Sequence, residues 1–167
     1  DSFYISLNDI LRNYTWCIPS ATNVIPANVS LYDHLKTTAA IASCLYDYYS
    51  VSNKEIVSRT DMQSSVGEDD VLMMLCIDIS GIQKFIYDIA NKRAAKSLKG
   101  RSFYLNILMQ HVIDKIISHE KINLYCTNVI YASGGKAYML LPNINRVHSA
   151  LEEIETNLQE FLWVELK

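Results

Sequence analysis

The stretch that most constrains this chain is residues 71–104, VLMMLCIDISGIQKFIYDIANKRAAKSLKGRSFY. Its apolar run, Val71–Ile77, ends at a single carboxylate, Asp78, and Ser80-Gly81 and a helical pattern follow. Such a run predicts a buried strand that delivers a polar loop at its carboxyl end. Nucleotide phosphates and metal ions often dock at loops of this kind. The stretch therefore predicts an α/β or α+β domain with a site just after its first strand.

Composition sets limits on the partners of this chain. Half of its 167 residues are hydrophobic and a fifth are charged, which predicts a globular core. The net charge of -3 gives no bulk attraction to nucleic acid, so any such binding would need a local patch. No apolar run approaches the roughly 20 residues that cross a bilayer, so no membrane partner is expected. The four cysteines form no CxxC pair, which favours a reducing, cytoplasmic location.

The first part of the chain is predicted to be helical. Residues 1–29 begin with a short helix and continue as an irregular segment that contains Pro19 and Pro26. Residues 30–49 form a longer helix, because Ser30 and Asp33 make an S-x-x-D start signal. The predicted apolar stripe of this helix comprises Leu31, Leu35, Thr38, Ala42, Leu45 and Tyr49.

His34 lies beside that stripe, next to Asp33. Its spacing allows two interpretations. One is a hydrogen-bonded histidine in the core or at its boundary. The other is a metal ligand, because neutral imidazole binds transition metals well.

Residues 50–70 are polar and contain the expected domain boundary, and a second unit follows. Its predicted elements, in order, are strand 71–79, helix 81–90, helix 102–118, strand 124–132, strand 136–141 and helix 146–163. Gly134-Gly135 supplies the positive φ angles that a tight β-hairpin turn requires. The order is βαββα, one strand short of a ferredoxin-like fold. Either the last strand lies beyond Lys167, which the length of the chain favours, or the sheet is completed differently.

The chemistry of this unit is limited by its carboxylates. Nucleotide joining on such a fold uses two divalent cations, which need clustered oxygen ligands. The sequence offers Asp78 and Ser80, but the hairpin turn, Ser133 to Lys136, contains no acid. We therefore expect a nucleotide-binding partner of a catalytic half, with no catalytic residue of its own. Asp78 is a possible metal ligand or a cap of the helix that begins near Gly81.

A basic run follows that helix and comprises Lys92, Arg93, Lys96, Lys99 and Arg101. It is explained equally well by phosphate or nucleic-acid binding, by a solvated helix face, or by contact with another subunit. Tyr87, Phe103 and Tyr104 flank the run, and at these spacings aromatic residues are more often part of the core than stacking platforms.

Three segments resemble one known family. DISGIQKFIY, followed by AAKSLKGRSFYL, is similar to the first Palm domain of the large, polymerase/cyclase-like signature subunit of type III CRISPR effector complexes, nearest the III-A form. VIYASGGKAYMLLPN resembles the second and third strands of that Palm domain. VSLYDHLKTTAAIASCLYDYY resembles the closing helix of the HD nuclease domain in the same subunit.

The resemblance implies a fragment of that subunit. Residues 1–55 would be the helical C-terminal part of the HD domain, 56–70 a linker, and 71–167 the first Palm domain, incomplete at its C-terminus. His34 would be one ligand of an incomplete HD site for a divalent transition metal. No His-Asp dipeptide occurs in the chain, so we expect no nuclease activity from it alone.

The resemblance also implies a function for the parent subunit. Two ATP molecules bind between two Palm domains and are joined into cyclic oligoadenylates when target RNA binds. The second Palm supplies the acidic motif for Mg²⁺ or Mn²⁺, and the HD domain cuts single-stranded DNA. Other effector subunits, crRNA and target RNA would be partners. By this likeness the nucleotide would contact Ser80, Gly81, Gln83, Gly134, Gly135 and Lys136.

Two other functions stay open. An autonomous nucleotidyl cyclase would need a second acid near the hairpin, and the SGGK turn argues against it. A noncatalytic, ferredoxin-like RNA-binding module would present aromatic residues on the open face of its sheet. Alternation along a strand would place Tyr125 and Tyr131 on one face, and Tyr138 lies on the next strand.

Overall fold

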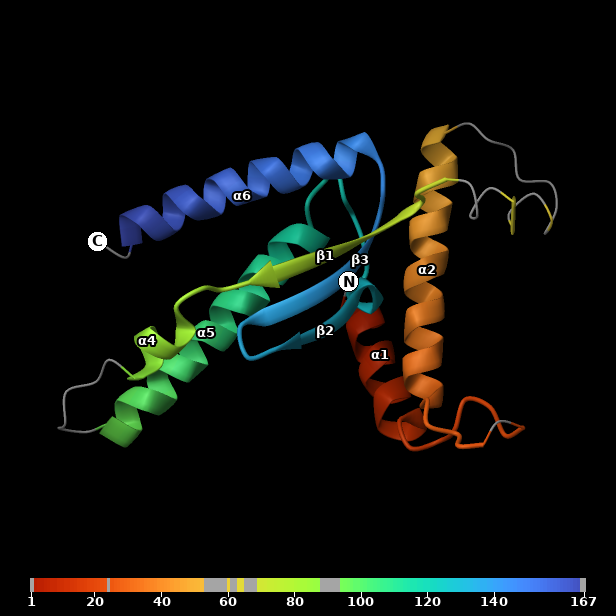
Figure 1. Cartoon of the computed structure of the whole chain (residues 1–167), viewed down its shortest axis with the longest axis horizontal. Coiled ribbons are helices and arrows are strands. Elements are labelled where there is room, and N and C mark those ends of the chain that lie inside the picture. The colour runs from red at the N-terminus through yellow and green to blue at the C-terminus, as the bar shows by residue number, and fades with distance from the viewer. Residues whose placement is uncertain are drawn as a thin grey trace.

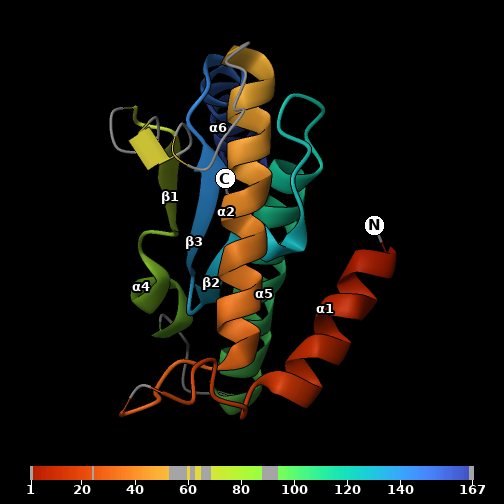
Figure 2. The ribbon, with the colours of Figure 1, turned by 90° about the vertical axis from the view of Figure 1, so that its right-hand side faces the viewer.

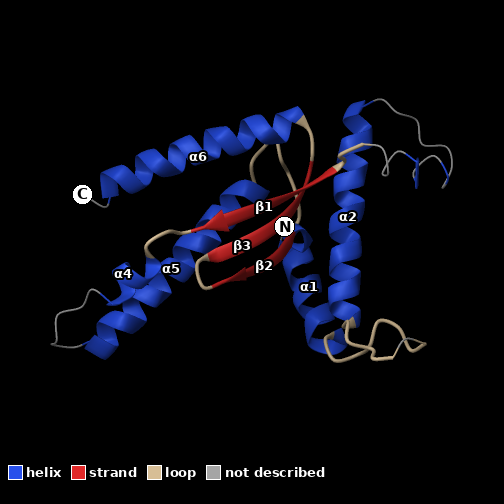
Figure 3. Cartoon of the chain, in the orientation of Figure 1, coloured by secondary structure: helices blue, strands red, loops and turns tan. Residues whose placement is uncertain are grey.

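The structure is a computed structural model that describes residues 2–23, 25–52, 60, 63–64, 69–87 and 94–165. In this part of the chain, a three-stranded antiparallel sheet has long helices on one face and at one end (Figures 1 and 3). In chain order the elements are α1 (Ser2–Thr15), α2 (Leu31–Ser52), β1 (Leu72–Asp78), α4 (Ile82–Tyr87), α5 (Ala94–Ile117), the 3-10 helix η1 (Cys126–Asn128), β2 (Val129–Ser133), β3 (Lys136–Pro142) and α6 (Asn145–Glu165). The chain is therefore an α+β protein, as predicted.

The sheet has the strand order β1-β3-β2. β1 pairs with β3 from Leu72 opposite Pro142 to Asp78 opposite Lys136, and β2 and β3 form the predicted hairpin. No described strand pairs with the other edge of β1. Residues on one face of β1 are exposed, and Met74 keeps 59% of its accessible surface. The prediction of a buried strand is therefore wrong within this chain, because only one face of β1 is covered.

The core lies on one face of the sheet. Ala137, Met139 and Leu141 are fully buried on β3, whereas the alternate residues Lys136 and Tyr138 point to the open face. They pack with residues of α5 and α6, the helices on that side (Figure 1). The helical part of the core comprises Met109, Val112, Ile113, Ile116, Val147, Ala150 and Ile154. Truncating one such side chain typically costs about 2–5 kcal/mol.

α2 lies across the sheet near the C-terminal part of β3 (Figure 2). Asn128, at the end of η1, is completely buried between them. Its amide nitrogen lies 3.0 Å from the carbonyl oxygen of Leu140 on β3 and 3.4 Å from that of Ala40 on α2. It also lies 3.1 Å from the hydroxyl of Ser43. One polar side chain thus joins α2 to the sheet, because a buried amide must find hydrogen-bond partners.

The start of α2 follows the prediction, but its buried side does not. The Ser30 hydroxyl accepts a hydrogen bond from the Asp33 amide at 2.9 Å, as the start signal requires. The fully buried residues of α2 are Ala40 and Cys44, whereas Leu35 on the predicted stripe is exposed. Apolar residues occur on several sides of this helix, so the tertiary contacts decided which side packs.

Two other element boundaries differ from the predictions. α5 begins at Ala94, well before residue 102, because AAK favours helix. β2 begins only at Val129, because residues 126–128 form η1 and the Asn128 side chain accepts a hydrogen bond from the Tyr125 amide at 3.3 Å. The predicted end of the helix 81–90, residues 88–90, and most of the linker 56–70 lie outside the described residues.

Candidate functional site

The loop after β1 meets the turn of the hairpin. The Ile79 amide donates a hydrogen bond to the Gly135 carbonyl at 2.9 Å. Ser133 pairs with Lys136, so Gly134-Gly135 forms a two-residue turn with φ angles of 60° and 84°. These positive angles are the ones that the sequence predicts for a tight hairpin. The structure therefore brings the two predicted halves of the site into contact.

Gly135 is needed for packing as well as for the turn. A Cβ atom at Gly135 would overlap the δ-methyl group of Ile82, the first residue of α4. At Gly81 and Gly134 a Cβ atom would meet no other atom within 4 Å. Gly135 thus has a structural role in packing, whereas the backbone at Gly81 and Gly134 is exposed and open to a ligand.

Asp78 and Lys136 face each other at the end of the β1–β3 ladder. The Lys136 amine lies 3.7 Å from a carboxylate oxygen of Asp78, and both side chains are about half exposed. Among the described residues, no hydrogen bond joins Asp78 to the start of α4, so the alternative role as a helix cap gains no support. Among the residues that the structure describes, no group of three or more His, Cys, Asp or Glu could hold a metal ion.

Ser80 and Gln83 are exposed on either side of the start of α4. Together with Asp78, Lys136 and the glycine turn they occupy one end of the sheet, at the left in Figure 1. Ser80 and the backbone of Gly134 can donate hydrogen bonds to anionic oxygens there, and Lys136 can add a positive charge. This arrangement can bind a phosphate group, but it offers too few oxygen anions for a metal pair.

His34 is not part of this end of the molecule. It lies on the first turn of α2, which is on the other side of the sheet from the hairpin turn (Figure 1). It is exposed, so its interpretation as a core residue is wrong within this chain.

The aromatic residues beside the basic run are also exposed, contrary to the core interpretation. Tyr87 keeps 72% of its accessible surface and Phe103 keeps 65%. Lys96, Lys99 and Arg101 lie in the first turns of α5, whereas residues 92 and 93 lie outside the described part of the chain. Sequence reasoning missed the contacts of Ile82 and Arg101 with neighbouring elements, because both depend on residues distant in the chain.

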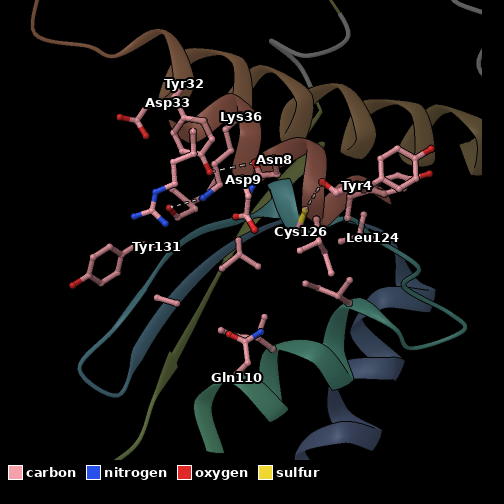
Figure 4. A pocket seen from close by; sticks show the side chains of 18 of the residues that line it. Tyr4, Asn8, Asp9, Tyr32, Asp33, Lys36, Gln110, Leu124, Cys126 and Tyr131 are labelled. Carbon is pink, nitrogen blue, oxygen red and sulfur yellow. Dashed lines mark hydrogen bonds between the residues drawn. The ribbon is translucent and has the colours of Figure 1, made fainter. Parts of the chain in front are cut away.

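A hollow of about 1210 Å³ lies elsewhere, between α1, α2, α5 and the outer edge of β2 (Figure 4). None of the predicted site residues lines it. Lys36 reaches into it, and its amine lies 3.5 Å from the carbonyl oxygen of Ile130. Burial lowers the pKa of this amine, and the nearby Asp33 carboxylate only partly offsets that effect. The hollow mixes both charge signs, with Asp9 beside Arg12 and Lys36, so it lacks the one-sided charge of an anion site. We therefore keep the loop and the hairpin turn as the candidate site.

Fold and site together define an α+β domain in which a glycine hairpin and the loop after the first strand form an end that can bind an anion. Residues 71–167 match the family described as Csm1 subunit domain B. The chain belongs to the Csm1 family, the large subunits of type III CRISPR systems.

Curated relatives agree with this assignment. The chain is 41% identical over 150 residues to the CRISPR system single-strand-specific deoxyribonuclease Cas10/Csm1 (subtype III-A) of Enterococcus italicus, covering 86% of this chain and 20% of that protein. The protein of the same description from Mycobacterium tuberculosis is 34% identical over 165 residues, covering 97% of this chain and 20% of that protein. The chain thus spans about a fifth of the length of these relatives.

Solved structures have the same fold. The crystal structure of a Csm1-Csm4 cassette in complex with pppApA superposes with a TM-score of 0.79 at 29% identity, covering 95% of this chain and 21% of that chain. A cassette in complex with one ATP gives a TM-score of 0.76 at 29% identity, covering 95% of this chain and 20% of that one. In the described part of the present chain, no helix is both long and apolar enough to span a membrane.

Proposed function

We propose that this chain forms one half of an ATP pocket in a type III-A CRISPR large subunit. The nucleotide contacts the residues of the loop and the hairpin turn, namely Ser80, Gly81, Gln83, Gly134, Gly135 and Lys136. A second Palm domain of the parent subunit supplies the acids that hold Mg²⁺ or Mn²⁺. The pair of domains then joins ATP into cyclic oligoadenylates when a cytoplasmic effector complex, with its crRNA and other subunits, binds target RNA.

One observation carries this proposal: the loop after β1 contacts the glycine turn, and Asp78, the carboxylate that the described residues place there, is already paired with Lys136. An exposed backbone with a serine and a lysine suits a triphosphate, because N–H groups and cations stabilise anionic oxygens. A single paired carboxylate does not suit two hard cations. Crystal structures of related Csm1-Csm4 cassettes with ATP and with cA4 support nucleotide binding in the family.

The strand order supports a ferredoxin-like Palm fold for residues 71–167. In β1-β3-β2, the outer edge of β1 is free of described strands, and a last strand following α6 would pair there. The same proposal assigns residues 1–55 to the end of an HD domain and 56–70 to a linker. In that HD domain, His34 is one ligand of a divalent transition metal, and the parent subunit cuts single-stranded DNA.

The test uses the full-length subunit in its effector complex. Replacing Ser80 by Ala should raise the KM for ATP in cyclic oligoadenylate synthesis about tenfold, because one hydrogen bond to a charged oxygen is lost. The matched control is Ser149→Ala on α6, an exposed serine whose hydroxyl bonds the Asn145 carbonyl of its own helix. Equal KM values for both variants would disprove the assignment.

The metal assignment has a separate test. His34→Ala should abolish DNA cleavage by the full-length subunit and leave cyclic oligoadenylate synthesis intact. Loss of both activities, or of neither, would contradict a role for His34 in a distinct HD site.

The RNA-binding alternative is supported by one observation. Tyr131 and Tyr138 are paired across β2 and β3 on the open face, with ring centroids 6.3 Å apart. Exposed rings of this kind can stack on bases. Tyr125 does not join them, since it precedes η1 and its ring packs 5.0 Å from that of Tyr4. Weaker single-stranded RNA binding by Tyr131→Ala, with unchanged ATP binding, would favour this alternative.

A further inference from the structure

α4 connects the two halves of the candidate site but is poorly stabilised by itself. It spans only Ile82–Tyr87 and has no fully buried residue. Isolated helices shorter than about 12 residues are marginal in water, so tertiary contacts must hold α4 in place. Any displacement of α4 would move Gln83 and Ile82, and with them the packing beneath the glycine turn.

At its N-terminal end α4 is held by shape. The side chain of Ile82 occupies the space that a Cβ atom of residue 135 would need. The Phe85 amide donates to the Gly81 carbonyl at 3.0 Å, which closes the first turn. This end therefore fixes a contact point but not the direction of the helix.

At its C-terminal end α4 is held by Arg101 of α5. The Arg101 guanidinium donates a hydrogen bond from Nη1 to the carbonyl oxygen of Phe85 and lies 5.2 Å from the centroid of the Phe85 ring. The Tyr104 ring, one turn further along α5, lies 6.0 Å from the same ring. Arg101 and Tyr104 thus hold one residue of α4 from two positions.

Arginine is suited to both contacts at once. The last carbonyls of a helix lack intrahelical partners, and a cation there also interacts favourably with the helix dipole. A planar guanidinium can stack on an aromatic ring while it donates a hydrogen bond, whereas a lysine amine acts as a point charge. The positive charge alone would not reproduce this geometry.

We infer that Arg101 is a positioning residue of the nucleotide site: it fixes the direction of α4, so that Ile82 stays against Gly135 and the neighbouring residues Ser80 and Gln83 keep their places in the site. The inference rests on the proposed function for its effect on ATP. Its structural half, the restraint of α4, does not depend on that function.

Two variants in the full-length subunit within its effector complex test both halves. Arg101→Met removes the hydrogen bond and the charge, and Arg101→Lys keeps the charge. Lys99→Met is the matched control, because Lys99 is an exposed cation on the same helix. The measurements are the KM and kcat for ATP in cyclic oligoadenylate synthesis and hydrogen exchange of the amides of residues 82–87.

Arg101→Met should raise the KM for ATP about tenfold with little change in kcat, and Arg101→Lys should rescue this only in part. Exchange of the α4 amides should quicken by a similar factor, while amides of β3 keep their protection. A loss of folding would instead lower kcat and quicken exchange throughout. Lys99→Met should change neither quantity.

Each other outcome is decisive. Unchanged α4 exchange in Arg101→Met, full rescue by Arg101→Lys, or an equal KM increase in Lys99→Met would overturn the inference. If exchange quickens but neither Arg101→Met nor Ser80→Ala alters the KM, the restraint stands and the proposed nucleotide function fails. If Ser80→Ala raises the KM and Arg101→Met does not, the site stands and the positioning role fails.

Discussion

Replacing Asn128 by Ala should uncouple α2 from the sheet. The amide nitrogen of Asn128 has two hydrogens and lies near acceptors on both sides, the Leu140 carbonyl at 3.0 Å and the Ser43 hydroxyl at 3.1 Å. Its oxygen accepts from the Tyr125 amide at 3.3 Å. Because Asn128 is completely buried, no water can replace these partners.

The expected cost follows from these contacts. Three hydrogen bonds at about 1 kcal/mol each give a loss of about 3 kcal/mol in the free energy of unfolding. For a chain of this size, each kcal/mol lowers the Tm by about 2–4 °C, so the Tm should fall by about 6–12 °C. This is a large part of the roughly 5–15 kcal/mol by which domains are stable.

The assay is urea and thermal unfolding of the chain, followed by circular dichroism. Asn106→Ala is the control, because it is the same substitution at an exposed position of α5. It should change the free energy of unfolding by less than about 0.5 kcal/mol. Ser43→Ala should cost about 1 kcal/mol and should add little in an Asn128→Ala background, since the two side chains share a bond. A loss for Asn128→Ala no larger than that for Asn106→Ala would refute the proposed coupling.

Three shorter predictions concern cysteines and glycines. Burial raises the pKa of Cys44 from its usual value of 9.0 to about 11, so the stability contributed by its neutral thiol should be complete below pH 9.0 and be lost as pH rises through about 11. The free energies of unfolding of wild type and Cys44→Ala, measured by urea titration at several pH values, should therefore converge across that range. A constant difference between them would contradict the raised pKa. A thiol reagent should label exposed Cys76 within minutes but label Cys44 only on unfolding, and comparable rates would disprove the burial. Gly135→Ala should be less stable than Gly134→Ala by about 1–3 kcal/mol in chemical unfolding, because only the former meets a neighbouring side chain, and equal losses would count against that packing.

Much of the fold of residues 71–165 could be predicted from local signals. The apolar run before Asp78, the Gly134-Gly135 turn and the periodic helix 146–163 each specify their own element, because hydrophobic spacing and positive φ angles act over a few residues. The structure confirms all three, within a few residues at their ends.

The candidate site was predictable in part. The two glycines are identifiable because a tight turn requires positive φ angles. Asp78 is identifiable because it is the carboxylate that ends an apolar run. Their contact, through the Ile79 amide and the Gly135 carbonyl, depends on how β1 pairs with β3, which no local pattern specifies. Arg101 was recognised only as a member of a basic run, since its partner Phe85 lies on another helix.

The sequence by itself determined the order of the strands, the hairpin turn and the long helices, although not the residues at which α5 and β2 begin. It also predicts that this end of the domain carries too few acids for a metal pair. Only the tertiary structure decided which side of α2 is buried. The helix has apolar residues on several sides. The hydrogen bonds of the Asn128 amide to the Ala40 carbonyl and the Ser43 hydroxyl hold one of these sides against the sheet. Such choices depend on partners distant in the chain, because burial and hydrogen-bond satisfaction are properties of the assembled core.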